Sequence, residues 1–152
     1  MKQQGVLIGT VKSVDDPQGI GQVQLLFPTL GITSNWAPVA VPLAGKSRGS
    51  WIMPELEDEV LVAFMDGNFN QPYVVGFLWN GQDKPPETDT KLRVIKTPGG
   101  HELRFEDKPG QKKVIVKTDG GLTITMDDSQ QSIEIKGGGR AVTMQSGQIK
   151  IT

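Results

Sequence analysis

The sequence predicts an all-β protein in two parts, a small barrel followed by a repetitive β region, and three observations support this fold class. The chain of 152 residues contains 19 glycines and 10 prolines, which disfavour long helices. Its first half contains short runs rich in Val, Ile, Phe and Trp that are bounded by Gly, Pro, Asn and Asp. Its second half repeats apolar pairs with a period of two residues, the period of a strand with one apolar face.

Five runs in the first half predict the strands of the barrel. They read GVLIGTVKSV, GQVQLLFP, NWAPVAVPLA, DEVLVAFMDG and PYVVGFLWNG. Five strands of this length suit a small closed or nearly closed barrel. Leu56, Val60 and Phe64 also fit a helical spacing of four, but the alternation of Val60, Val62 and Phe64 and the β-branched residues around them favour a strand.

A boundary follows the barrel. The stretch GQDKPPETDTK, which begins at Gly81, combines a Pro-Pro pair with many charges and contains no apolar residue, as is typical of a linker. We therefore predict a barrel domain at 1–80, a linker at 81–92 and a β-repeat domain at 93–152.

Each apolar pair in the second half predicts one short strand with a single apolar face. Ile124, Ile133 and Val142 follow one another at intervals of nine residues, with Gly, Asp, Ser or Gln in the gaps. This spacing is typical of a β-repeat with a turn at each corner. The predicted core residues of the repeat are Leu103, Phe105, Val114, Val116, Leu122, Ile124, Met126, Ile133, Ile135, Val142, Met144, Ile149 and Ile151.

These strands need a partner, because they are short and each has only one apolar face. Apolar positions in this half are also too sparse to give a solenoid a core of its own. Copies of the same chain wound about a common axis would point every apolar face inward and close the open edges. Ordinary strands of a monomeric sandwich or solenoid are the alternative. The pattern continues to the end of the sequence, so the last layer of the repeat is expected to be covered by another protein.

The composition argues against several classes of function. Sixteen Lys and Arg residues against seventeen Asp and Glu residues give a formal charge of −1, which disfavours binding to a nucleic-acid backbone. Without cysteine, the chain forms no disulfide or zinc–thiolate site and has no cysteine nucleophile. The opening residues MKQQGVLIGTVKSV fit neither a signal peptide nor a membrane span, so we expect synthesis and assembly in the cytoplasm.

No catalytic, cofactor-binding or metal-binding residue is predicted. The single histidine, His101, stands beside a glycine pair, where a surface histidine is commoner than a threefold metal ligand. The acidic run from Glu55 to Glu59 is interpreted as a solvated loop. The stretch DGNFNQ, from Asp66 to Gln71, is interpreted as a hairpin turn rather than a calcium loop. Serines such as Ser34 are not accompanied by a nucleophile-elbow motif.

Four aromatic residues leave two interpretations open. Trp36, Trp51, Tyr73 and Trp79 lie near the ends of β-runs, where packing in the barrel or in a subunit contact is the usual role. They would alternatively offer stacking platforms for bases or sugars.

Four stretches, taken in order, resemble the central spike proteins of contractile injection systems. This family includes VgrG of type VI secretion, baseplate assembly protein V of contractile phage tails and the spikes of extracellular injection particles. The stretches are GTVKSVDDPQGIGQVQLLFP, NWAPVAVPLAG, PELEDEVLVAFMDGNFNQPYVVGFLWNG and HELRFEDKPGQKKVIVKTDGGLTITMDD, and they cover nearly the whole chain. The sequence departs from the family pattern at Glu57, where relatives commonly have glycine, and it shows no hub-like domain ahead of the barrel.

The resemblance implies an OB-fold β-barrel followed by an intertwined triple-stranded β-helix, or β-prism, in a homotrimer. It implies a structural needle that is not an enzyme, punctures the target envelope and meets the target membrane only transiently. Its implied partners are a baseplate hub protein, a PAAR-like tip protein at the C-terminal end and effector cargo. Lys150, Ile151 and Thr152 would contact the tip protein. The chain would be part of a virion, a secretion apparatus or a released injection particle.

The alternative function is an OB-fold binding module for single-stranded nucleic acid or glycan, with the β-repeat as a trimerising tail. Such a module needs a basic groove lined by aromatic residues. Lys46 and Arg48 form the only compact basic pair near a tryptophan in the sequence.

Overall fold

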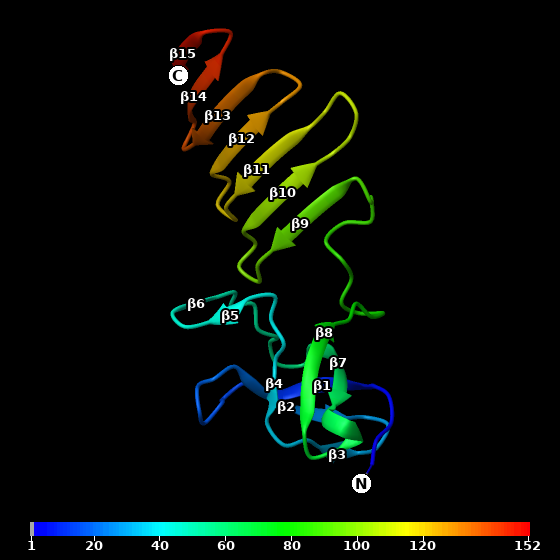
Figure 1. The fold of residues 1–152 in the computed structure, drawn as a ribbon. Helices are drawn as coiled ribbons and strands as arrows, with labels where there is room; N and C mark the ends of the chain where they lie inside the picture. Colours follow the sequence, from blue (N-terminus) through cyan, green and yellow to red (C-terminus); the bar gives the residue numbers. More distant parts are fainter. Residues whose placement is uncertain (1) are drawn as a thin grey trace. The chain divides into compact units, whose positions relative to one another are not determined.

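The computed structural model describes residues 2–152 and divides into two compact units, Met1–Lys84 and Pro85–Thr152. Within the described residues, the regular structure consists of fifteen strands and one short 3-10 helix (Figure 1). This content confirms the predicted all-β fold class. The division between the units falls inside the stretch expected to be a linker, 81–92.

Five strands of the first unit form a closed ring. They are β1 (Leu7–Ser13), β2 (Gln22–Phe27), β4 (Ala37–Pro38), β7 (Glu59–Phe64) and β8 (Pro72–Phe77). β1 pairs antiparallel with β2 and with β7, and β7 pairs with β8. β2 also pairs with β4, and Val39, the residue after β4, bridges to Val74 of β8. The ring of pairings therefore closes, as expected for a small β-barrel.

The barrel core follows from the alternation of the strands. Every second residue of β2 and of β7 is buried, which places Phe27 and Phe64 inside the barrel. Phe69 joins them from the turn after β7, and the three ring centroids lie 5.3 to 5.8 Å apart. Aromatic pairs at this separation stabilise a core beyond the area that they bury. The strand interpretation of the run that contains Val60 and Val62 is therefore confirmed.

The third predicted strand is much shorter than its run. Of NWAPVAVPLA, β4 includes only Ala37 and Pro38, because proline offers no N–H to a ladder. The chain continues into a small hairpin of β5 (Ala44–Gly45) and β6 (Arg48–Gly49), which extends away from the barrel strands in Figure 1. A further short strand, β3 (Ile32–Thr33), pairs with β2.

One turn of the barrel depends on an acidic side chain. The Asp16 carboxylate accepts backbone hydrogen bonds from Gln18, Ile20 and Gln22 at 2.7 to 3.0 Å. Slight desolvation would raise the pKa of Asp16, but these backbone donors outweigh it and hold the pKa below its ordinary value of 3.8. In another turn, Glu57 has φ of 71°, which lies in the left-handed region that favours glycine.

The turn between β7 and β8 is the hairpin turn predicted for DGNFNQ. It contains the 3-10 helix η1 (Met65–Gly67), and Asn68 donates its backbone N–H to the carbonyl oxygen of Met65 at 2.8 Å. The buried side chain of Phe69 anchors this turn in the core.

The second unit is a single antiparallel meander of seven strands (Figure 1). Its strands are β9 (Leu92–Lys96), β10 (Glu102–Glu106), β11 (Lys113–Lys117), β12 (Thr123–Asp127), β13 (Ser132–Gly137), β14 (Arg140–Gln145) and β15 (Gln148–Ile151). Each strand hydrogen-bonds to the strands before and after it in the chain, and the sheet order is the chain order. The six apolar pairs predicted as strands correspond to β10 to β15.

One strand of this sheet was not predicted. β9 begins at Leu92, the last residue of the expected linker, and pairs with β10 along its whole length. Val94 and Ile95 are adjacent in the sequence, so they hide the period of two that marks the later strands. The one indication of this strand in the sequence was Ile95, which precedes Leu103 by a spacing similar to that between the later strands.

Candidate functional site

The register of the seven-stranded sheet sets the apolar side chains of consecutive strands opposite one another. Leu103 pairs with Val116, Val116 with Ile124, and Ile124 with Ile135. Since alternate residues of a strand point to the same side, two rows form on one face of the sheet. The first row is Ile95, Leu103, Val116, Ile124, Ile135, Val142 and Ile151, and the second row is Arg93, Phe105, Val114, Met126, Ile133, Met144 and Ile149. We call this surface the apolar face.

In the single chain the apolar face is more exposed than the opposite, polar face. Ile124, Met126 and Ile133 are 43%, 44% and 39% exposed. Thr125 and Glu134, which point to the polar face of the same strands, are half-buried. A sheet with one solvated face normally buries its apolar side. The burial pattern is therefore inverted, and the apolar face lacks a cover within the chain.

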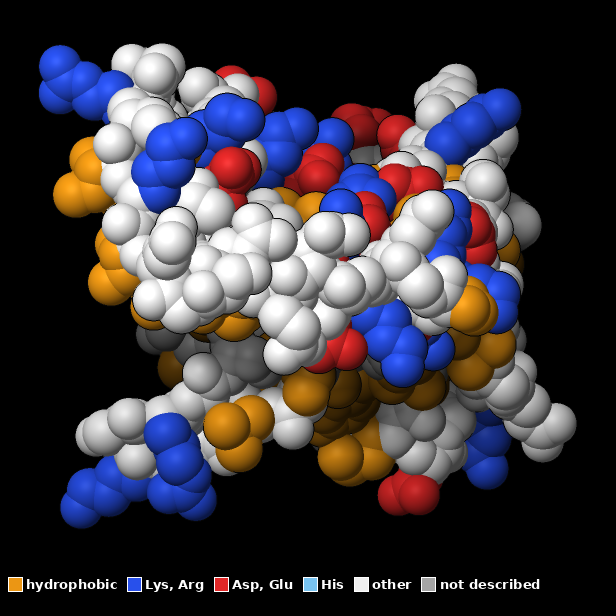
Figure 2. All heavy atoms as spheres, turned by 90° about the horizontal axis from the view of Figure 1, so that it is seen from above, with side chains coloured by type: hydrophobic (Ala, Val, Ile, Leu, Met, Phe, Trp, Pro, Cys, Tyr) orange, Lys and Arg blue, Asp and Glu red, His pale blue; other side chains and the backbone are white. Residues whose placement is uncertain are grey.

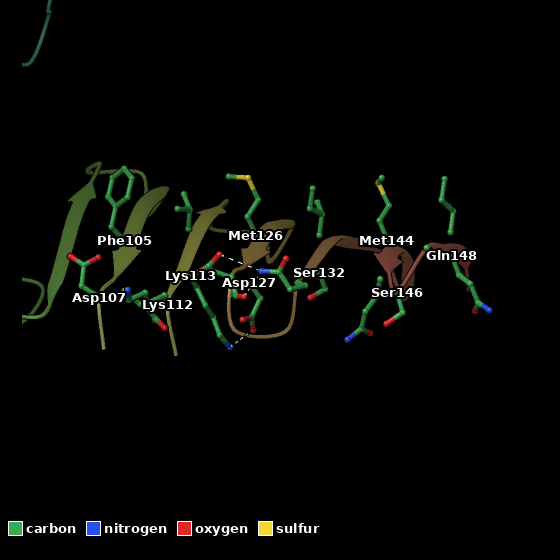
Figure 3. Close-up of a pocket in the computed structure, with 18 residues that line it drawn as sticks. Phe105, Asp107, Lys112, Lys113, Met126, Asp127, Ser132, Met144, Ser146 and Gln148 are labelled. Atoms are coloured by element: carbon green, nitrogen blue, oxygen red, sulfur yellow. Dashed lines mark hydrogen bonds and ion pairs between the residues drawn. The ribbon is translucent and has the colours of Figure 1, made fainter. Parts of the chain in front are cut away.

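Figure 2 shows the kinds of side chain at the surface, and Figure 3 shows how side chains of the sheet lie. Clusters of hydrophobic side chains lie at the surface in the space-filling view of Figure 2. In Figure 3, Phe105, Met126 and Met144 stand on one side of the sheet, while Lys113 and Asp127 lie on the other. Contiguous exposed apolar surface is a mark of an interaction site.

A groove runs along the second row of the apolar face. Its volume is about 810 Å³, and it extends from β10 to β15. Apolar side chains of the row, including Phe105 and Ile149, line it together with the turns at one edge of the sheet. These turns are 107–112, 128–131 and 146–147, which place polar groups along the rim. The groove is elongated and open rather than an enclosed pocket for a small molecule.

The polar face carries ion pairs between neighbouring strands. Lys96 Nζ lies 3.2 Å from Glu102 Oε1, and Lys113 Nζ lies 3.2 Å from Asp127 Oδ2. Opposite charges at directly opposed positions stabilise a sheet modestly. The charged side chains are thereby held on the face opposite the two apolar rows.

Glu87 extends this ion-pair network to the segment before β9. Its Oε1 lies near Arg104 Nη1, at 2.6 Å, and Arg104 also contacts Glu102 at 3.4 Å. The hydrogen bond from Arg104 to Glu87 raises the pKa of the Arg104 guanidinium, and the hydrogen bond from Lys96 is the main cause that lowers the pKa of Glu102. Asp89 similarly pairs with Lys108 at 3.0 Å. Residues 87 and 89 of the expected linker are thus fastened to the second unit.

All thirteen residues predicted for the repeat core share the apolar face. Twelve lie in the two rows defined above. Leu122 precedes β12 on the same side, and its Cδ2 occupies the space where a Cβ on Gly137 would lie. Sequence reasoning missed Ile95 and Arg93 of β9, which extend the rows by one strand. Whether these residues form the core of a trimer stays a prediction at this point.

The predicted tip contacts lie at the free edge of the sheet. Ile151 ends β15 and is 78% exposed, and Thr152 forms two backbone hydrogen bonds with Ala141 at 2.7 and 2.9 Å. Lys150 is also exposed. The outer edge of β15 pairs with no strand within residues 2–152, and its contact with a tip protein stays a prediction.

The other residues weighed from the sequence take structural positions. His101 Nδ1 accepts a hydrogen bond from the Asp119 backbone N–H at 3.2 Å, which joins two turns at one edge of the sheet. In the acidic run, Asp58 accepts a backbone hydrogen bond from Glu55 at 2.8 Å, and Glu57 pairs with Lys12 at 2.8 Å. Within residues 2–152, no three His, Cys, Asp or Glu side chains gather in a way that could hold a metal ion.

The aromatic side chains divide into two groups. Trp36 and Tyr73 are half-buried, whereas Trp51 and Trp79 are 74% and 65% exposed. Trp51 and Trp79 are therefore not part of the barrel core in the single chain, and the subunit contact that the sequence also allowed for them stays a prediction. The only helix within residues 2–152, η1, has three residues and is far too short for a membrane span.

Comparison with known proteins identifies both units. Residues 7–79 match the type VI secretion system/phage-baseplate injector OB domain, and residues 93–152 match the phage baseplate V C-terminal trimerisation domain. The first match confirms the OB-fold barrel.

Curated relatives are spike proteins of type VI secretion systems. VgrG5 of Pseudomonas aeruginosa is 34% identical over 114 residues, which is 66% of this chain and 14% of that protein. VgrG4b of the same species is 33% identical over 93 residues, 55% of this chain and 12% of that protein. VgrG3 of Vibrio cholerae is 30% identical over 133 residues, 74% of this chain and 13% of that protein. The matched region is thus less than one sixth of the length of these relatives. With an OB domain and a phage-baseplate trimerisation domain in the family's order, the chain belongs to the family of type VI secretion and phage-baseplate spike proteins.

Proposed function

We propose that this chain is one third of a structural spike, in which three copies pack their apolar faces around a common axis. Each sheet contributes two rows of apolar side chains to the shared interior and turns its ion-paired polar face to solvent. Three sheets packed in this way form a β-prism. The chains wind around one another only in the trimer. The OB barrels lie at the N-terminal end of each chain.

The observation that carries this proposal is the inverted burial of the second unit. Isoleucines, methionines and a phenylalanine stand 39% to 78% exposed on one face, while threonines and carboxylates on the other face are half-buried. Such a face is stable in water only when it is covered. The match of the same residues, 93–152, to a trimerisation domain supports two further copies of the chain as the cover.

The mechanical role follows from closed hydrogen bonding and a dry axial core. Force applied along the axis acts on seven strands that are each paired to the next, so it is distributed across many hydrogen bonds. We propose that the spike connects a hub protein of the baseplate to a tip protein at the β15 edge and punctures the target envelope. In this proposal the chain is not an enzyme, and it is assembled in the cytoplasm into an injection apparatus.

The test is the mass of the assembly in solution. Gel filtration with light scattering on the full chain is expected to give three times the 16.5 kDa of one chain, unchanged on dilution. Ile133→Asp would place three like charges in the interior and is expected to give monomers, since unpaired buried charges are costly. A wild-type chain that is monomeric at every concentration would disprove the proposal.

A second candidate function rests on one feature of the barrel. Trp51 is 74% exposed and follows the hairpin that carries Lys46 and Arg48, an arrangement that suits stacking on a base or a sugar. This module would bind single-stranded nucleic acid or glycan. Binding of an oligonucleotide that weakens with salt and is lost in Trp51→Ala would support it, and the absence of binding would leave the spike as the sole candidate.

A further inference from the structure

Two methionines stand in the second row of the apolar face. Met126 in β12 and Met144 in β14 both pair with Ile133 of the strand between them. Both line the groove, and in Figure 3 their side chains stand on the same side of the sheet. The two residues are 44% and 46% exposed in the single chain, so a small oxidant in water can reach them. Since the chain has no cysteine, methionine is the side chain that a peroxide oxidises most readily.

Oxidation turns methionine from an apolar into a polar side chain. A lone pair of the thioether sulfur attacks one oxygen of hydrogen peroxide, so that an S–O bond forms and the O–O bond breaks. The sulfur loses two electrons and becomes a sulfoxide, while the leaving oxygen takes up the proton of the transferred one and departs as water. Burying the sulfoxide oxygen without a hydrogen-bond donor is unfavourable. The cross-strand partners of the two methionines, Val114, Ile133 and Ile149, offer no side-chain donor.

We propose that Met126 and Met144 form an oxidation site that is open in the free chain and closed in the assembled spike, an inference that rests on the proposed trimer. Peroxides reach both side chains as long as the apolar face is uncovered. Each oxidised chain then brings two sulfoxides to the shared interior, so only chains with reduced methionines assemble. Methionine sulfoxide reductases reverse the step, because two thiols become a disulfide and the sulfoxide oxygen leaves as water.

The chain contains a matched reference for a first test, which measures whether assembly closes the site. Met65, in the turn after β7, is 46% exposed but lies outside the apolar face. The native full-length protein is treated with hydrogen peroxide, and mass spectrometry follows sulfoxide formation at each methionine. On an uncovered face, Met126 and Met144 would react about as fast as Met65. We expect them to react at least about tenfold more slowly, because oxidation follows exposure.

A second test measures whether oxidation prevents assembly. Two full-length chains are compared, and both carry Met53→Leu and Met65→Leu, so that oxidation within the barrel makes no contribution. The second chain also carries Met126→Leu and Met144→Leu. Leucine is close to methionine in volume and does not react with peroxide. Both chains are unfolded, treated with hydrogen peroxide, freed from it and refolded, and light scattering after gel filtration gives their masses.

Only the chain that retains Met126 and Met144 is expected to lose assembly. A trimer of this chain would hold six sulfoxides, and a loss of about fivefold for each lowers the association constant by about four powers of ten. Methionine sulfoxide reductases with a dithiol should restore the trimer. Met126→Gln with Met144→Gln, which places permanent polar groups at both positions, should be monomeric without any oxidant. Circular dichroism checks that the barrel is folded in each sample.

The outcomes separate this inference from the proposed trimer. Equal assembly of the two oxidised chains, or equal oxidation rates at the three methionines in a protein of trimeric mass, would overturn the oxidation site and leave the trimer standing. Wild-type assembly of the glutamine variant, or no recovery after reduction, would also overturn it. A wild-type chain that is monomeric before any treatment would overturn the trimer itself.

Discussion

Substitution of two adjacent residues in β12 tests which face of the sheet is covered. Ile124 lies in the first row of the apolar face, and Thr123 points to the polar face. Across the sheet Thr123 is flanked by Lys117 and Lys136, so an aspartate at position 123 would face two cations. Ile124→Asp and Thr123→Asp therefore add the same charge to the same strand in opposite environments.

The expected difference can be estimated from exposure. Ile124 is 43% exposed in the single chain. Covering the exposed part of the Ile124 side chain in the trimer contributes about 1 kcal/mol per copy. An unpaired carboxylate in a dry interior costs several kcal/mol. For three copies the loss exceeds about 10 kcal/mol, or about seven powers of ten in the association constant. Ile124→Asp should thus be monomeric at micromolar concentration, whereas Thr123→Asp should remain trimeric.

Light scattering after gel filtration, over a hundredfold dilution series, measures the difference. Circular dichroism on the same samples checks that the barrel is still folded. A trimer of Ile124→Asp that is as stable on dilution as the wild type would show that the apolar face is not the interface. Dissociation of Thr123→Asp to the same degree would show that the two faces were assigned wrongly.

Three further predictions concern the barrel. Ser34→Ala removes the acceptor of the buried Leu25 N–H, 3.0 Å from the hydroxyl oxygen, and should lower the free energy of unfolding by about 1–3 kcal/mol in chemical denaturation. The pKa of Asp16 lies below 3.8 in the folded chain, so the ionised carboxylate stabilises the fold above that pH. This stabilisation is lost as the pH falls through the folded-state pKa. The melting temperature of Asp16→Asn should therefore depend less on pH in this range than that of the wild type. Gly9→Ala would place a Cβ 3.3 Å from a core valine and should destabilise the barrel by about 1 kcal/mol or more, whereas Gly76→Ala meets open space and should be neutral or slightly stabilising in the same thermal melts.

The parts of the fold that depend on local pattern could be predicted from the sequence. Alternation placed Val60, Val62 and Phe64 in a barrel strand, and it placed the six later apolar pairs on one face of a sheet. These predictions succeed because side-chain direction in a strand depends only on parity. The same parity argument indicated which face lacks a cover.

The parts that depend on pairing between distant residues could not be predicted. Closure of the barrel by Val39 and Val74 requires knowledge of which strands meet in space. β9 was hidden because Val94 and Ile95 are adjacent, and its pairing with β10 reveals Ile95 as a member of the first row. The sequence assigned no role to Arg93, and only the register sets it opposite Phe105.

The strictly sequential pairing of the second unit has a consequence for how such proteins vary. Every strand of the sheet pairs only with its neighbours in the chain. A tandem duplication of one hairpin, such as β12 with β13, would therefore add two strands without changing the pairing of the others. Each added hairpin would lengthen the molecule by about 9.6 Å. Gene duplication can therefore adjust the length of the sheet in discrete steps, while the length of its strands and the chemistry of its two faces stay constant.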